Sequence, residues 1–229
     1  MAKVSEKVSN VIDQSDYLSR DLSWLKFDER VLDQARSVHR PLMERLKFLA
    51  ITDSNLDEFF TIRVGSLYNY LDYHKQRVDY SGLREVPFKK ALFTATQQFS
   101  MMQQEIFTQE LLPLFPENQL RIVELADLNR NEQAHANDYF DRTIYPTLTP
   151  MLYDYTHTFP VLLAKVLIFG VVTQNTDAAN DRKVVSDDED DRQRLSFVQI
   201  PANLPRFMPF ERASETLFLP IEEIVRHNI

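Results

Sequence analysis

The chain has 229 residues, enough for one large or two modest domains, and its 44% apolar and 26% charged residues are typical of a folded protein. Three glycines leave little room for glycine-dependent turns and exclude a Gly-rich phosphate loop, and the lack of cysteine excludes disulfides and thiol nucleophiles. The net charge of −8 argues against a nucleic-acid-binding surface.

The N-terminal half of the chain is predicted to be helical. Residues 1–16 are polar, lack the apolar core of a signal peptide and are expected to form a loosely ordered arm. Apolar residues then recur at helical spacing from Leu22 to Ala35, with Ser19 or Asp21 as the N-cap. Pro41 is expected to begin a second helix, since its missing N–H costs nothing there. The polar face of this helix is expected to carry Glu44, Arg45 and Lys47.

A third helix is expected to begin at Asp53 or Ser54. Ser54, followed by Asp57 and Glu58, resembles a capping box, in which side chains satisfy the free N–H groups of a first turn. The stretch 79–87 contains a glycine and a proline and is predicted to be a loop. A long helix should follow from about residue 88 to 112, until two prolines end it. We therefore expect a helical domain over residues 17–115 and a second domain over residues 116–229.

The second domain is predicted to mix helices with antiparallel strands. The expected elements are a strand at 120–123, a helix at 131–144, a proline-punctuated loop at 146–160, antiparallel strands at 161–172 and 195–200, a strand at 217–219 and a helix after Pro220. The run 161–172 is too short to span a bilayer, so no transmembrane segment is expected. Five consecutive carboxylates at 187–191 are interpreted as a solvated loop and not as a metal site.

The expected fold class is therefore α+β: an N-terminal helical bundle followed by a mixed α/β head domain with antiparallel strands. The last predicted helix reaches Ile229 without a capping glycine. We accordingly expect the head domain to be incomplete at its C-terminus.

The side chains by themselves indicate no catalytic set. None of the five histidines has a partner at metal-ligand spacing. Adjacent residues on a helix point about 100° apart, so helix capping is a better explanation of Asp57 and Glu58 than an acid–base pair. Asn55 is expected in the first turn of the third helix, where its amide has either a structural role or a role in reading the edge of a base. Arg63 could meet a phosphate or pair with a carboxylate.

Three blocks of sequence carry a resemblance to a known family. Residues 18–32, L-S-R-D-L-S-W-L-K-F-D-E-R-V-L, resemble the pattern L-S-W-L-x-F-N-x-R-V-L preceded by an acidic residue. Residues 41–51 resemble P-L-x-E-R-L-K-F-L-x-I, and residues 54–64 resemble N-L-D-E-F-F-x-V-R-V. In this order and spacing, the blocks are similar to the N-terminal part of polyphosphate kinases of the first type. The clear departure is Asp28, where the family usually has asparagine. Looser matches at 145–150, 200–207 and 219–225 extend the resemblance to the end of the chain.

The resemblance implies an ATP-polyphosphate phosphotransferase that transfers the terminal phosphate of ATP reversibly, with magnesium. It places the phosphorylated histidine, the phosphate-binding arginines and the Mg ligands in C-terminal domains outside this segment, so we expect the segment alone to be inactive. Within the segment the resemblance assigns a nucleotide contact to Asn55, and no catalytic or metal-binding residue.

The resemblance also implies partners and a location. ATP, ADP and polyphosphate are the expected ligands, with no nucleic acid. A homo-oligomer, dimer or tetramer, is expected to form through the head domain in the cytoplasm, with membrane association as an alternative. The candidate contact residues are Phe159, Leu162, Phe169 and Phe207, for which ordinary core positions are the favoured alternative. The competing hypothesis for the whole chain is a non-catalytic helical module for interaction or dimerisation, which needs no nucleotide.

Overall fold

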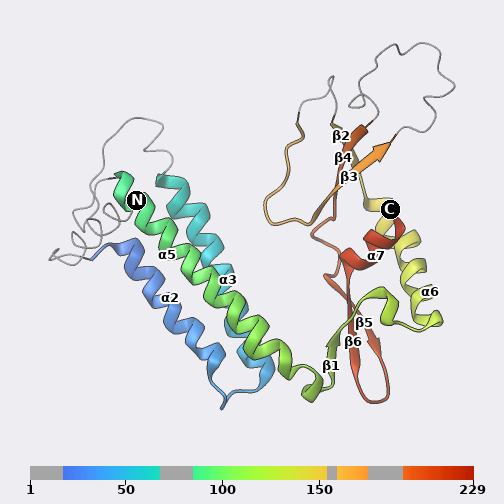
Figure 1. Ribbon diagram of the computed structural model, residues 1–229, viewed down its shortest axis with the longest axis horizontal. Helices are drawn as coiled ribbons and strands as arrows, with labels where there is room; N and C mark the ends of the chain where they lie inside the picture. The colour runs from blue at the N-terminus through green and yellow to red at the C-terminus, as the bar shows by residue number, and fades with distance from the viewer. Residues whose placement is uncertain (1–17, 68–84, 154–158, 175–192) are drawn as a thin grey trace, which may run out of the picture. The chain divides into compact units, whose positions relative to one another are not determined.

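The computed structural model describes residues 18–67, 85–153, 159–174 and 193–229 (Figure 1). The chain divides into two compact units, Met1–Asn118 and Gln119–Ile229. The predicted arm at residues 1–16 and the acidic run at 187–191 lie outside the described residues. The first unit is helical and the second combines helices with two small sheets, so the predicted α+β fold is confirmed.

Three long helices lie side by side in the first unit (Figure 1). The N-cap of the first is Ser19, one of the two predicted residues, whose hydroxyl accepts a hydrogen bond from the Leu22 N–H at 3.4 Å. Two of the three helices continue into π-helical turns. The elements are α2 (Arg20–Arg36), α3 (Leu42–Phe59), η1 (Phe60–Val64), α5 (Glu85–Glu105), η2 (Ile106–Leu111), η3 (Leu112–Leu114) and η4 (Pro116–Asn118).

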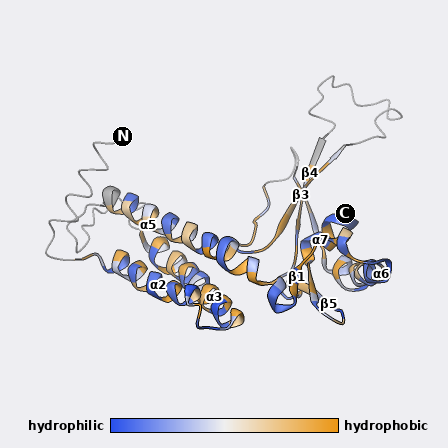
Figure 2. Ribbon diagram, turned by 60° about the horizontal axis from the view of Figure 1, so that its bottom comes forward, coloured by the Kyte–Doolittle hydropathy of each residue, from blue (hydrophilic) through white to orange (hydrophobic). Residues whose placement is uncertain are grey.

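Apolar residues at helical spacing hold these helices together. Hydrophobic and hydrophilic residues alternate along all three, as an amphipathic helix requires (Figure 2). On α2 the stripe consists of Leu25, Leu32 and Ala35, each at most 2% exposed. On α5 and η2 it includes Phe99 and Ile106, both fully buried. The predicted stripes of these two helices therefore face the core.

The prediction of a separate third helix at Asp53 or Ser54 is wrong, because α3 runs unbroken from Leu42 to Phe59. Thr52 is fully buried, and its hydroxyl donates to the Leu49 carbonyl at 2.8 Å and accepts from Gln103 Nε2 at 3.1 Å. These bonds satisfy the side chain inside the helix, so it does not compete with the backbone. Because no helix begins at Ser54, the capping-box interpretation of this residue is wrong as well.

The placement of Arg45 on the polar face of α3 is also wrong. The residue is 6% exposed, and its Nε donates to the Ala35 carbonyl at 2.6 Å. Ala35 lies in the last turn of α2, where carbonyl groups lack intrahelical partners and favour a cation. Arg45 of α3 therefore satisfies a carbonyl group at the C-terminal end of α2. The sequence pattern indicated only an exposed charged residue at this position.

The prediction of a loop at 79–87 is wrong for its last three residues, which belong to a helix. Residues 79–84 lie outside the described part of the chain, and α5 begins at Glu85. Pro87 is accommodated because a proline in the first turn of a helix removes only an N–H group that has no intrahelical partner.

The described residues of the second unit form two three-stranded sheets. In the first, the strand order is β1-β6-β5, with β1 parallel and β5 antiparallel to β6. In the second, the order is β2-β4-β3 and both pairs are antiparallel. The strands are β1 (Leu120–Ile122), β2 (Pro150–Tyr153), β3 (Ile168–Gln174), β4 (Gln193–Gln199), β5 (Phe207–Glu211) and β6 (Thr216–Pro220). The helical elements are η5 (Leu125–Asp127), α6 (Arg130–Tyr139), η6 (Phe140–Ile144), η7 (Tyr145–Thr147) and α7 (Ile221–Asn228).

Most predicted elements of this unit are present, and the differences concern proline. The antiparallel pair β3–β4 is confirmed, although β3 begins at Ile168 and not at Val161. Strand β2 was missed because Pro150 indicated a loop, and strand β5 was not predicted, although it too contains a proline, Pro209. Both lie on edge strands, where a residue without an N–H is tolerated.

A hydrophobic core connects the described elements of the second unit. It joins strand β6 to helices α6 and α7 and to the turn η5. Its fully buried members are Ala136, Ile144, Leu217, Leu219, Ile224 and Val225. No helix in the described part of the chain has the length and apolar character needed to cross a membrane.

Candidate functional site

Two of the motif blocks that carry the family resemblance form the seam between α2 and α3. Trp24 stacks on Phe59 with ring centroids 4.6 Å apart and an interplanar angle of 13°. One turn away, Asn55 of α3 bonds to Asp28 of α2. The motif residues are therefore in large part a helix-packing motif, and Asn55 lies within this seam.

Asp28 and Asn55 are joined by a direct hydrogen bond. Asn55 Nδ2 donates to Asp28 Oδ1 at 2.8 Å, across 27 residues of sequence. Asp28 is 0% exposed, and its second carboxyl oxygen, Oδ2, has no hydrogen-bond partner among the described residues. Burial raises the pKa of the Asp28 carboxyl above its ordinary 3.8, while the hydrogen bond from Asn55 partly opposes this rise. The pair thus contains a buried carboxyl that is only half satisfied.

Asn55 retains hydrogen-bonding capacity beyond this pair. The residue is half-buried, and its carbonyl oxygen Oδ1 makes no hydrogen bond within the described part of the chain. A side-chain amide carries two N–H donors and one carbonyl, so one donor and one acceptor remain after the bond to Asp28. A purine base presents adjacent donors and acceptors on its edge, and the remaining groups of Asn55 can pair with them.

The other residues of the motif lie elsewhere on the same helical segment. Asn55, Asp57 and Glu58 lie in the last turns of α3, not in a first turn, and the helix continues into η1. The favourable dipole position assumed for the two acids is therefore wrong. Arg63 lies in η1, where its Nε is 3.9 Å from Asp21 Oδ1 of α2, so it neighbours a carboxylate.

The described residues contain no group of three His, Asp or Glu side chains that could hold a metal ion. Of the five histidines, His39, His135 and His227 are exposed, and the other two lie outside the described residues. These observations concern only the part of the chain that the structure describes.

Sequence reasoning missed Asp28 as a site residue, although a signal was present. Asp28 lies on the same helical stripe as Leu25, Leu32 and Ala35, three residues after the first of them. An ionisable residue on a buried stripe requires a partner. That the partner is Asn55 could not be read from the sequence, because it depends on how α2 packs against α3.

A surface hollow of about 540 Å³ lies between α3 on one side and α5 with its continuation η2 on the other. Its lining mixes apolar side chains with amides, and Gln103, one of these amides, is already bonded to Thr52. The lining residues are Leu46, Leu49, Ala50, Asp53, Ser100, Gln103, Gln104 and Phe107. No cation lines it, so it lacks a group to neutralise a phosphate.

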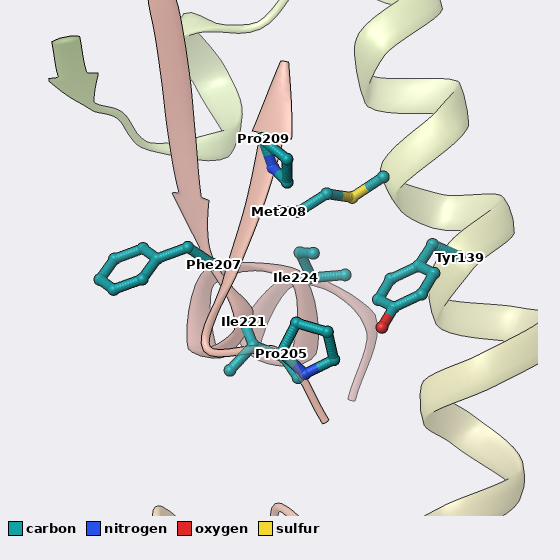
Figure 3. A pocket seen from close by; sticks show the side chains of 7 residues that line it. All are labelled: Tyr139, Pro205, Phe207, Met208, Pro209, Ile221 and Ile224. Atoms are coloured by element: carbon teal, nitrogen blue, oxygen red, sulfur yellow. The ribbon is translucent and has the colours of Figure 1, made fainter. Parts of the chain in front are cut away.

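A smaller cavity of about 160 Å³ lies in the second unit (Figure 3). Tyr139 of α6 faces Met208 of β5 and Ile224 of α7 across it, while the Phe207 ring points away. The remaining lining residues are Pro205, Pro209 and Ile221. With the Tyr139 hydroxyl as its one side-chain polar group, the cavity offers no chemistry for a nucleotide.

The second unit also carries exposed aromatic residues near β2 and β4. The Phe159 ring lies 5.2 Å from that of Phe197 and 5.6 Å from that of Tyr153, yet Phe159 is 57% exposed. Among the other candidate contact residues, Phe207 is 39% exposed. Phe169 is half-buried and packs against the core, and Leu162 is half-buried. The four candidates thus differ in exposure, since two of them are exposed and two are half-buried.

Comparison with known proteins agrees with this architecture. A family model described as the N-terminal domain of polyphosphate kinase matches residues 17–123, and one described as its middle domain matches residues 131–229. The polyphosphate kinase of Lactiplantibacillus plantarum is 35% identical over 217 residues, which cover 95% of this chain and 29% of that protein. That of Thermosynechococcus vestitus is 33% identical over 219 residues, covering 93% of this chain and 28% of that protein.

A solved structure is similar as well. The crystal structure of polyphosphate kinase from Porphyromonas gingivalis matches with a TM-score of 0.73 and 25% identity, over 93% of this chain and 30% of that one. The fold thus resembles the N-terminal and middle domains of a larger protein, a polyphosphate kinase. The chain belongs to the polyphosphate kinase family. It spans less than a third of the length of these relatives.

Proposed function

We propose that this chain is the N-terminal portion of a polyphosphate kinase and that Asn55 contacts the base of ATP. The observation that carries the proposal is the geometry of Asn55: one end of its amide is held by Asp28, and the other has no hydrogen bond within the described part of the chain. The reaction we propose for the complete enzyme is the reversible transfer of the terminal phosphate of ATP to polyphosphate, and membership of the polyphosphate kinase family supports it.

The chemistry of phosphate transfer is proposed to lie outside this segment. The described residues offer no cluster of three acidic or histidine side chains for magnesium. A phosphohistidine route needs a nucleophile and cations around the transferring group. We therefore assign the phosphohistidine and the Mg ligands to other parts of the enzyme, and we expect residues 1–229 alone to have no kinase activity.

Replacing Asn55 with alanine in the complete enzyme tests the base contact. We expect the KM for ATP to rise roughly tenfold, because about one to two hydrogen bonds to the base are lost. Steady-state kinetics at saturating polyphosphate give the constants, and Ser54→Ala is a matched control because Ser54 is the exposed neighbour on α3. An unchanged KM for ATP would reject the role of Asn55 and favour a non-catalytic interaction module.

We also propose that residues 17–115 form the N-terminal domain, and that residues 116–229, the head domain, take part in homo-oligomer formation in the cytoplasm. The exposed rings of Tyr153 and Phe159, which pack on the half-buried Phe197, support this, since aromatic residues are enriched at protein interfaces. The same cluster would serve the alternative, a non-catalytic interaction module.

Replacing Phe159 with serine tests the proposed contact. If the ring is buried between subunits, its loss should weaken association by about 2 kcal/mol or more. Light scattering after size-exclusion chromatography, over a range of concentrations, measures the change in mass. Val38→Ser is the control, since Val38 is 78% exposed and lies in the first unit. An oligomer that dissociates at the same concentration in both variants would place the contact elsewhere.

A further inference from the structure

Along the α2–α3 seam, side chains spaced four residues apart on α3 and η1 each meet a side chain of α2. The three pairs are Asn55 with Asp28, Phe59 with Trp24, and Arg63 with Asp21. Because residues four apart on a helix lie on one face, Arg63 lies on the same face as Asn55. Eight residues separate the two in sequence, which corresponds to about 12 Å along a helix axis.

The Arg63 guanidinium group is held only loosely by α2. Its side chain is 43% exposed, and the 3.9 Å between its Nε and Asp21 Oδ1 is longer than a hydrogen bond. The same carboxylate oxygen lies 3.7 Å from the Nε of Arg20, the first residue of α2, whose side chain is 58% exposed. Two guanidinium groups therefore share one carboxylate, and one positive charge is left over.

Three other arginines of the first unit are bound more firmly. Arg36, Arg40 and Arg45 each donate a hydrogen bond to an acceptor of the protein, at 2.9, 3.0 and 2.6 Å. Neither Arg20 nor Arg63 makes a side-chain hydrogen bond within the described part of the chain. A guanidinium group carries five N–H donors in a fixed fork, so both arginines retain donors for a further acceptor.

A phosphate group is the acceptor that this arrangement fits. Its oxygens match the fork of a guanidinium group, and its negative charge offsets the positive charge left over. The N-terminal end of α2 adds a partial positive charge beside Arg20. A nucleoside triphosphate carries its phosphates beyond the ribose, at a distance from the base comparable with the spacing between Asn55 and Arg63.

We propose that Arg63, assisted by Arg20, binds a phosphate group beside the base held at Asn55. The nucleotide and a polyphosphate chain both offer such a group, and the experiment below distinguishes them. For the place of the base, the inference rests on the proposed function of Asn55. It concerns the binding of a phosphate group and not its transfer.

A purely structural role of Arg63 would depend on Asp21. The guanidinium group would then tie η1 to α2, although an exposed and loose pair of charges contributes little to stability. Under this alternative, removing either partner should have the same effect. If Arg63 instead binds a phosphate, Asp21 competes with that phosphate for the guanidinium group, and the two substitutions should have opposite effects.

Replacing Arg63 with glutamine in the complete enzyme tests the inference. We expect a roughly tenfold rise in the KM for ATP at saturating polyphosphate, or in the KM for polyphosphate at saturating ATP, and the constant that rises identifies the ligand. Asp21→Asn should lower the same KM roughly twofold to fivefold, because it removes the competing carboxylate. Arg30→Gln is the matched control, since it removes an exposed arginine of α2 that lies over the Phe27 ring. Unchanged KM values for both substrates in Arg63→Gln would overturn the inference, and so would an equal rise in Arg63→Gln and Asp21→Asn.

Adenosine, which has the base without phosphates, separates the inference from the proposed function. As a competitive inhibitor against ATP, it should lose affinity in Asn55→Ala and keep its affinity in Arg63→Gln. If Asn55→Ala weakens adenosine while Arg63→Gln changes neither KM, the base contact stands and only the phosphate site is rejected. If Asn55→Ala leaves ATP and adenosine unaffected, the base contact fails, and the phosphate site beside it is rejected as well.

Discussion

Replacing Phe59 with alanine is expected to lower the free energy of unfolding by about 3–5 kcal/mol, the usual cost of truncating a buried aromatic residue. Phe59 is 4% exposed, stacks on Trp24 and belongs to the apolar cluster between α2, α3 and α5. Its loss leaves a cavity in the seam one turn from Asn55. Urea denaturation followed by circular dichroism measures the change.

The neighbouring residue of the same motif supplies the control for this prediction. Phe60 is 37% exposed and contacts Phe93 edge-to-face, at a centroid distance of 6.3 Å. Phe60→Ala should therefore cost about half as much or less, since less apolar surface leaves water on folding. A double-mutant cycle with Trp24→Ala should give a coupling of about 0.5–1.5 kcal/mol for the stacked pair. Equal losses at Phe59 and Phe60 would contradict the packing described for the seam.

The helices of the first unit could be predicted because local periodicity determines which residues of α2 and α5 are buried. Leu25, Leu32 and Ala35 recur at helical spacing and all face the core. The error at Ser54 arose because serine, aspartate and asparagine cap helices but are also tolerated inside them. Tertiary contacts decide whether such a polar residue begins a helix or lies inside one. Within α3, for example, the Thr52 hydroxyl accepts a hydrogen bond from Gln103 of α5, 51 residues away.

In the second unit, too, local sequence could predict some strands and not others. Strand β6 and the pair β3–β4 could be predicted from runs of β-branched and aromatic residues. The strands containing Pro150 and Pro209 could not, because proline excludes only central strands, and the position of a strand within a sheet is not a local property.

The candidate site could be predicted in part. Asn55 was indicated by the family resemblance, and its nucleotide contact stays a prediction. Asp28 was noted as a departure from the family pattern, but its pairing with Asn55 required the geometry of two helices. A side-chain pair that joins two helices leaves no spacing motif in the sequence, so it is found only after the helices have been packed.

Replacing Asp28 with asparagine is expected to stabilise the chain by about 1–3 kcal/mol at pH 8, because a neutral amide costs less to bury than a carboxylate. Asparagine keeps an oxygen to accept from Asn55 Nδ2 and removes the charge from a side chain that is 0% exposed. It is also the residue that the family pattern usually has at this position. Urea denaturation of both proteins gives the difference in the free energy of unfolding.

The gain should depend on pH in a direction set by the raised pKa of Asp28, which is caused first by burial. Because the folded chain binds this proton more tightly than the unfolded chain, the stability from protonated Asp28 is fully present below the ordinary pKa of 3.8 and is lost as pH rises through the folded-state pKa. The amide of the Asp28→Asn variant does not titrate, so the advantage of this variant should be largest at pH 8 and should shrink as pH falls toward 3.8. Asp33→Asn, on the exposed side of α2, should change stability by less than about 0.5 kcal/mol at either pH. An advantage of equal size at both pH values would mean that the buried charge of Asp28 is not its source.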